Sequence, residues 1–147
     1  MSHARIKPAM LQIESHAYRT QEALIRTAPG YGRAATAFPA PRSASYVELD
    51  MATEQESALA EPAIVEIAQR HGVSAAQVVL RWGLQRGTAV IPKTSKPERL
   101  KENSDLSAFA LSDDDMAAIA GLNKNRRFND PGVFCADAFN TVHAIYD

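Results

Sequence analysis

The sequence lacks most features that would place a protein outside a reducing compartment. Among its 147 residues there is a single cysteine, Cys135, so an internal disulfide is excluded. No apolar run approaches the roughly 20 residues needed to cross a bilayer, and the N-terminus has no apolar segment typical of a secretory signal. The net charge of −1 gives no reason to expect binding to nucleic acid or an anionic membrane. We therefore expect a soluble, cytoplasmic protein that binds neither.

Recognisable catalytic constellations are also missing. The sequence has no metal-ligand spacing and no Ser/His/Asp or Cys/His arrangement, so we expect no metal site and assign no catalytic residue. His16 is expected to hold a loop, whereas Tyr18, Tyr31 and Tyr46 are expected to be packing or surface residues. Cys135 is expected to be a bystander rather than a nucleophile.

What the sequence does contain is enough apolar material for one domain, with 46% hydrophobic and 22% charged residues. Short apolar runs predict three strands, at residues 9–14, 34–38 and 88–91. Apolar positions at helical spacing predict helices at 20–27, 61–71, 75–86, 97–103 and 113–122. Alternation of strands and helices predicts an α/β fold with parallel strands joined by right-handed crossovers. Two segments, 39–60 and 123–147, are expected to be irregular.

Capping residues set the expected helix boundaries. Thr20 and Ser74 are expected to be N-caps, and Gly72 ends the helix that precedes Ser74. Ser112 followed by Asp115 three residues later is a capping box, which predicts a helix start.

A cluster of basic and hydroxyl side chains follows the third predicted strand and precedes a helix. Lys93, Lys96 and Arg99 supply positive charge within a few residues, and Thr94 and Ser95 add hydroxyl donors. Ligands of α/β folds bind at the carboxyl ends of parallel strands. A helix N-terminus there attracts anions. The pattern predicts a phosphate site, with a solvated basic turn as the alternative.

The order of residues in this turn resembles a known family. The matching motifs are Ile91-Pro92-Lys93-Thr94, Pro97-Glu98-Arg99 and Glu102-Asn103. They resemble the I-P-K-S, P-E-R and E-N motifs of the aldo-keto reductases, which are NADP(H)-dependent carbonyl reductases built on a (β/α)8 barrel. The resemblance implies that the 2′-phosphate of NADP(H) is held by Lys93 and Arg99, with hydrogen bonds from Thr94 and Ser95. It further implies that Asn103, with Glu102, meets the adenine.

The resemblance spans nearly the whole chain. Residues 7–18 are similar to the family's K-P-A-V-N-Q-I-E-x-H-P-Y, which implies that Gln12 binds the nicotinamide carboxamide. The T-A-F strand implies that Phe38 stacks on the nicotinamide ring. Residues 75–86 resemble the family's A-Q-V-L-L-R-W-x-L-Q-R-G, and residues 127–147 resemble the C-terminal segment that closes over the substrate pocket. The stretch 45–49 (S-Y-V-E-L) and the long tail resemble the sugar or xylose reductase-like branch.

The chain departs from the family pattern around the nicotinamide. Leu11 stands in place of an asparagine, and Ala17 in place of a proline. The S-P-L-G turn that would wrap the pyrophosphate is replaced by residues 39–42 (P-A-P-R), whose two prolines lack backbone N–H donors.

Residues 1–147 as a whole therefore resemble the C-terminal part of an NADP-dependent oxidoreductase domain. We expect a partial (β/α)8 (TIM) barrel, comprising about the last three βα units and an irregular tail. The family's Asp, Tyr, Lys and His tetrad comes from the first four strands and has no counterpart here. The resemblance implies reduction of aldehydes or ketones to alcohols by hydride transfer, with this chain inactive alone. The alternative is a non-catalytic nucleotide-binding or interaction module, and the open sheet edges favour self-association.

Overall fold

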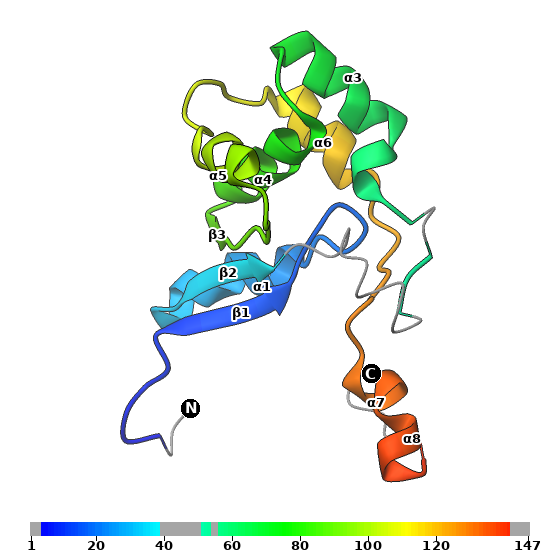
Figure 1. Ribbon diagram of the computed structural model, residues 1–147. Helices are drawn as coiled ribbons and strands as arrows, with labels where there is room; N and C mark the ends of the chain where they lie inside the picture. The colour runs from blue at the N-terminus through cyan, green and yellow to red at the C-terminus, as the bar shows by residue number, and fades with distance from the viewer. Residues whose placement is uncertain (1–3, 39–50, 54–55, 142–147) are drawn as a thin grey trace.

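The computed structural model describes residues 4–38, 51–53 and 56–141 (Figure 1). Three strands, β1 (Met10–Glu14), β2 (Ala34–Phe38) and β3 (Thr88–Val90), form one sheet in the order β1-β2-β3. Both pairings are parallel, as the sequence predicts. The strand positions agree with the predicted ranges to within one residue, because each strand coincides with a short apolar run bounded by turn residues.

Helices follow the strands, so the α/β class is confirmed. The 3-10 helices are η1 (Ala28–Tyr31) and η2 (Ala58–Ala60). The α-helices are α1 (Glu22–Thr27), α3 (Pro62–His71), α4 (Ala75–Gln85), α5 (Pro97–Ser104), α6 (Asp113–Ala120), α7 (Pro131–Phe134) and α8 (Ala136–Phe139).

The main core lies among the helices α3, α4 and α6, which Figure 1 shows grouped on one side of the sheet. Ile64 and Ile67 of α3, Val78 and Trp82 of α4, and Ile119 of α6 are almost completely buried. These residues recur at helical spacing along each helix, so each helix buries one apolar stripe against the others. The predicted helices at 61–71 and 75–86 are confirmed.

Helix α4 also packs closely on the sheet because Gly83 has no side chain. A Cβ atom at this position would lie 2.7 Å from Val90 Cγ1. The Thr88 hydroxyl donates to the Gly83 carbonyl oxygen at 2.8 Å, which joins the end of α4 to the start of β3. This connection holds the start of β3 against α4, and the basic turn follows at the other end of this three-residue strand.

The opposite face of the sheet is only partly covered in the described part of the chain, where Thr36 and Glu14 are buried but their neighbours are not. Met10 is 54% exposed, and Gln12 and Ala89 on the same face are also exposed. Both outer strands, β1 and β3, have an edge without a paired strand among the described residues. Parallel sheets ordinarily have both faces covered, so this three-stranded sheet is incomplete by itself.

Two expectations from the sequence are wrong. Thr20 does not cap α1, because its carbonyl oxygen accepts hydrogen bonds from Ser15 and Arg86; the N-cap is Gln21, in the left-handed region with φ of 54°. The tail is not wholly irregular, since it contains α7 and α8. Asp130 caps α7 by accepting from the Gly132 N–H at 3.0 Å, and a proline occupies the first turn.

Some of the predicted features fall on residues outside the described ranges. The prolines and the arginine at 39–42 and Tyr46 lie there, and the predicted irregular segment 39–60 is described only at 51–53 and 56–60, where it includes η2. Among the helices that are described, none combines the length and apolar character needed to span a membrane.

Candidate cofactor site

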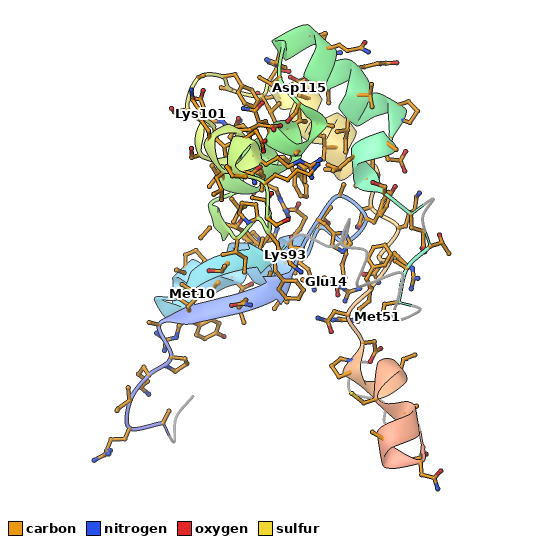
Figure 2. All side chains as sticks on the ribbon, in the orientation of Figure 1. Met10, Glu14, Met51, Lys93, Lys101 and Asp115 are labelled. Atoms are coloured by element: carbon orange, nitrogen blue, oxygen red, sulfur yellow. The ribbon has the colours of Figure 1, made fainter. Side chains whose placement is uncertain are left out.

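The basic turn lies between the end of β3 at Val90 and the start of α5 at Pro97, as predicted. Lys93, Lys96 and Arg99 are all exposed. None of the ion pairs found among the described residues involves these three side chains. The turn therefore presents three cationic groups that no carboxylate of the described chain neutralises. Figure 2 labels Lys93 in this turn and Lys101 in α5.

The local conformation leaves the start of α5 open. Lys96 is the N-cap residue, and no side chain caps the helix. The Thr94 hydroxyl oxygen accepts from the Lys96 N–H at 3.1 Å, which folds the turn back on itself. Pro97 in the first turn has the backbone angle that a helix start requires. The Arg99 N–H is already bonded to the Lys96 carbonyl oxygen at 3.1 Å, so the helix start offers mainly the positive end of its dipole, which lies beside the basic side chains.

The other end of α5 is held by α4. Gln77 Nε2 donates to the carbonyl oxygens of Glu102 at 3.2 Å and of Asp105 at 3.1 Å. Arg81 Nη1 donates to the Leu106 carbonyl oxygen at 3.1 Å. Glu102 and Asn103 are half-buried, so they occupy the fixed end of the helix. One end of the candidate site is thus rigidly supported, while the basic end faces solvent.

Gln12 and Phe38 lie together on the partly covered face of the sheet. Gln12 pairs in register with Thr36, and Glu14 pairs with Phe38, so these residues alternate onto the same face. Phe38 is half-buried at the carboxyl end of β2. The basic turn follows β3, two strand spacings from β1, or about 10 Å across the sheet. The eight predicted cofactor residues thus fall into two groups. Six lie in the basic turn and α5, and the other two, Gln12 and Phe38, lie on the strands β1 and β2.

A cluster around Glu14 was not anticipated from the sequence. The buried Glu14 carboxylate accepts from His16 Nε2 at 3.0 Å and from the backbone N–H groups of Phe128 at 2.8 Å and Asn129 at 3.2 Å. Burial alone would raise the pKa of Glu14, but these hydrogen bonds hold it below its ordinary value. Two residues beyond Gln12, this carboxylate fastens the tail to the carboxyl end of β1. A charged residue at the end of an apolar strand was the only sequence signal.

Neighbouring aromatic side chains complete the attachment of the tail. Phe128 is 3% exposed and packs against His16 and Tyr18, with ring centroids 5.3 and 6.4 Å away. His16 also forms a backbone bridge with Arg19, which confirms that it holds the loop after β1. The Tyr18 carbonyl oxygen accepts from two backbone N–H groups of the segment 124–126.

The described tyrosines are packing or surface residues, as expected. Tyr18 is buried and donates to Glu61 Oε1 at 2.6 Å, while Tyr31 is 64% exposed. Burial and the Glu61 carboxylate raise the pKa of Tyr18 above the ordinary value of 10.0. A raised pKa makes this phenol a poorer acid at neutral pH. The described residues also contain no group of three or more potential metal ligands.

Comparison with known proteins gives this geometry its context. The model of the Aldo/keto reductase family matches residues 1–124. This chain belongs to the aldo/keto reductase family. Its curated relatives include a probable NAD(P)H-dependent D-xylose reductase of Emericella nidulans, 45% identical over 133 residues, and another of Aspergillus fumigatus, 47% identical. Each alignment covers 89% of this chain but only 42% of the relative, so the chain spans about two-fifths of their length.

Solved structures agree with this placement. The aldose reductase of Schistosoma japonicum is 36% identical with a TM-score of 0.69, covering 86% of this chain and 37% of that one. A mutant of Gox0644 in complex with NADPH is 33% identical with a TM-score of 0.72, covering 88% and 44%. These neighbours are (β/α)8 barrels, so the three parallel strands with their helices are part of such a barrel.

Proposed function

We propose that this chain forms the cofactor-binding part of an NADP(H)-dependent aldo-keto reductase. The observation that carries the proposal is the basic turn, where Lys93, Lys96 and Arg99 are exposed and have no ion pair within the described chain. A phosphate monoester supplies the negative charge that this turn lacks, and an arginine can bind it with two parallel hydrogen bonds.

In this proposal the 2′-phosphate of NADP(H) binds to Lys93 and Arg99. Thr94 and Ser95 add hydrogen bonds to the phosphate, and the half-buried Glu102 and Asn103 meet the adenine. The preference for NADP(H) over NAD(H) follows, because only the former carries the phosphate that these cations would bind.

At the other end of the cofactor, Gln12 hydrogen-bonds the nicotinamide carboxamide and Phe38 stacks on its ring. Their shared position on one face of the sheet supports this role. The relatives named as NAD(P)H-dependent D-xylose reductases and the NADPH complex among the structural neighbours also support a nicotinamide cofactor.

The reaction we propose for the whole domain is reduction of an aldehyde or ketone, such as an open-chain sugar, to an alcohol. Hydride passes from the nicotinamide to the carbonyl carbon, and an acid supplies a proton to the oxygen. The buried Tyr18 is unsuited to that second step because its hydroxyl donates to Glu61 and its pKa is raised. We therefore propose that this chain alone does not catalyse the carbonyl reduction. The proton donor would come from the part of the barrel that its relatives contain and this chain does not.

Fluorescence titration with NADPH tests the binding proposal. We expect saturable binding to the full chain, weaker binding of NADH, and loss of NADPH binding in the Lys93→Ala/Arg99→Ala double variant. Lys101→Ala is the matched control, because this exposed lysine of α5 lies outside the proposed phosphate contacts. Equal affinity for NADPH and NADH, or an unaffected double variant, would contradict the proposed site.

A carbonyl-reduction assay tests the claim of incompleteness separately. We expect no NADPH oxidation with D-xylose or a simple aldehyde by the full chain. Turnover that exceeds a no-protein control would overturn this part of the proposal while leaving the binding site intact.

The second candidate function is that of a non-catalytic module that binds another copy of itself. It is favoured by the unpaired edges of β1 and β3 and by the exposed apolar side chains Met10 and Ile91, which are 54% and 47% exposed. Sedimentation velocity should then show dimers or larger species that lysine substitution at Met10 reduces. A concentration-independent monomer would exclude this function.

A further inference from the structure

A small cavity lies between α4 and the sheet, away from the proposed cofactor residues. It is bounded on its apolar side by Trp82 and Gly83 of α4 and by Val90 of β3, and on its polar side by His16 and Arg86. The cavity volume open to the centre of a water molecule is about 10 Å³, which is about the minimum needed to hold one water. Its size therefore excludes a cofactor or substrate, but not a single small ligand.

Two buried side-chain nitrogens on the cavity-lining residues have no hydrogen-bond partner. They are His16 Nδ1 and Arg86 Nε. The His16 residue is 1% exposed, and the Arg86 side chain is 7% exposed. Buried polar groups are nearly always hydrogen-bonded, because an unsatisfied one loses its hydration without compensation. Two such atoms on residues lining one cavity point to a shared partner.

The other contacts of these side chains define what each nitrogen requires. His16 Nε2 lies 3.0 Å from the Glu14 carboxylate, which can only accept, so Nε2 carries a hydrogen, and in the neutral form of the ring Nδ1 is an acceptor. Arg86 Nε carries a hydrogen and can only donate. The rest of the guanidinium is fixed, since it donates to Ser15 and Thr20 and stacks on Trp82 at 4.1 Å. The cavity thus combines one donor and one acceptor.

We propose that this cavity is a binding site for one structural water molecule, which accepts from Arg86 Nε and donates to His16 Nδ1. Chloride would satisfy only the arginine, and a metal ion would satisfy only the histidine while being repelled by the guanidinium. Water satisfies both. It also completes a polar chain from α4 through His16 and Glu14 to the backbone N–H groups of Phe128 and Asn129. The end of α4 is thereby linked to the start of the tail.

NMR on the full chain tests the site directly. We expect cross-relaxation between water and the ring protons of His16 and Trp82, with the opposite signs in the laboratory and rotating frames that mark a long-lived water. The ¹⁵N shifts of His16 should show a protonated Nε2 and a bare, hydrogen-bonded Nδ1. Absence of the water signal, a protonated Nδ1, or saturable shifts of these protons on adding chloride would each overturn the proposal.

A substitution at Arg86 provides a second test of the proposed water site. Arg86→Met removes the donor and should abolish the water signal at His16. It should also increase the rate of hydrogen exchange at the Phe128 and Asn129 N–H groups. Arg81→Met is the matched control on α4, and should leave the signal unchanged because Arg81 lines no part of the cavity. A water signal that survives Arg86→Met would contradict the assigned donor, and the measurement on the parent chain decides the matter if the variant does not fold.

Discussion

Replacing Asp115 by asparagine should make the free energy of unfolding of this protein depend less steeply on pH in the acidic range. The Asp115 side chain is 4% exposed. Its carboxylate accepts from Arg70, from His71 Nε2 at 2.9 Å and from the Ser112 N–H at 3.1 Å, so it joins α3 to the start of α6. Burial alone would raise the pKa of this carboxyl, but the hydrogen bonds lower the pKa from 3.8 to about 2.

The size of the effect follows from the difference between the folded and unfolded pKa values. The folded pKa of Asp115 is the lower one, so its charged form stabilises the fold above about pH 4, and this contribution is lost as the pH falls to about 2. A shift of just under two pKa units, at about 1.4 kcal/mol per unit, corresponds to about 2 kcal/mol of stability.

Urea unfolding of the parent and of Asp115→Asn, measured from neutral pH down to about pH 2, tests this value. The difference in free energy of unfolding between the two proteins should shrink by about 2 kcal/mol over that range. The matched control is Asp114→Asn, because Asp114 lies in the same first turn but is exposed. A difference between parent and Asp115→Asn that stays constant with pH would refute the assigned hydrogen-bonded carboxylate.

Two other substitutions test the packing of the core. Gly83→Ala should lower the free energy of unfolding by about 1–3 kcal/mol, because the added Cβ would lie 2.7 Å from Val90 Cγ1. Gly30→Ala, where nothing lies within 4 Å, should change it little, and equal effects would contradict the close approach of α4 to the sheet. Tyr18→Phe should cost about 1.5 kcal/mol through loss of a charge-assisted hydrogen bond, whereas the exposed Tyr31 should tolerate the same change. An alkaline absorbance titration that lacks a phenol with a raised pKa would contradict the buried Tyr18 bond.

Local patterns in the sequence were sufficient for most of the elements. The capping box of Ser112 and Asp115 and the end of α3 at Gly72 are found as predicted, because both depend on residues a few positions apart. The tail helices were missed although Asp130 before Pro131 is itself a helix-start signal. The helices that follow are only four residues long, which is too short for an apolar periodicity that would distinguish them from irregular chain.

The contacts that the sequence could not predict join distant segments. Glu14 binds backbone N–H groups more than a hundred residues away, and backbone donors leave no pattern in the sequence. His16 and Arg86 meet at one cavity only because the loop after β1 and the end of α4 are brought together by the sheet. By contrast, the basic turn is a continuous segment, so its position between β3 and α5 could be predicted from the order of its residues alone.

The most direct test of the central claim is to map the binding of 2′,5′-ADP, a small ligand that carries both the adenine and the 2′-phosphate. Backbone amide shifts of the full chain should change on addition of this ligand in the segment 91–103, and 5′-AMP should produce much weaker changes. The Lys93→Ala/Arg99→Ala variant should lose this response and keep the spectrum of a folded protein. Equal responses to the two nucleotides, or shifts confined to residues outside this segment, would contradict the proposed 2′-phosphate site.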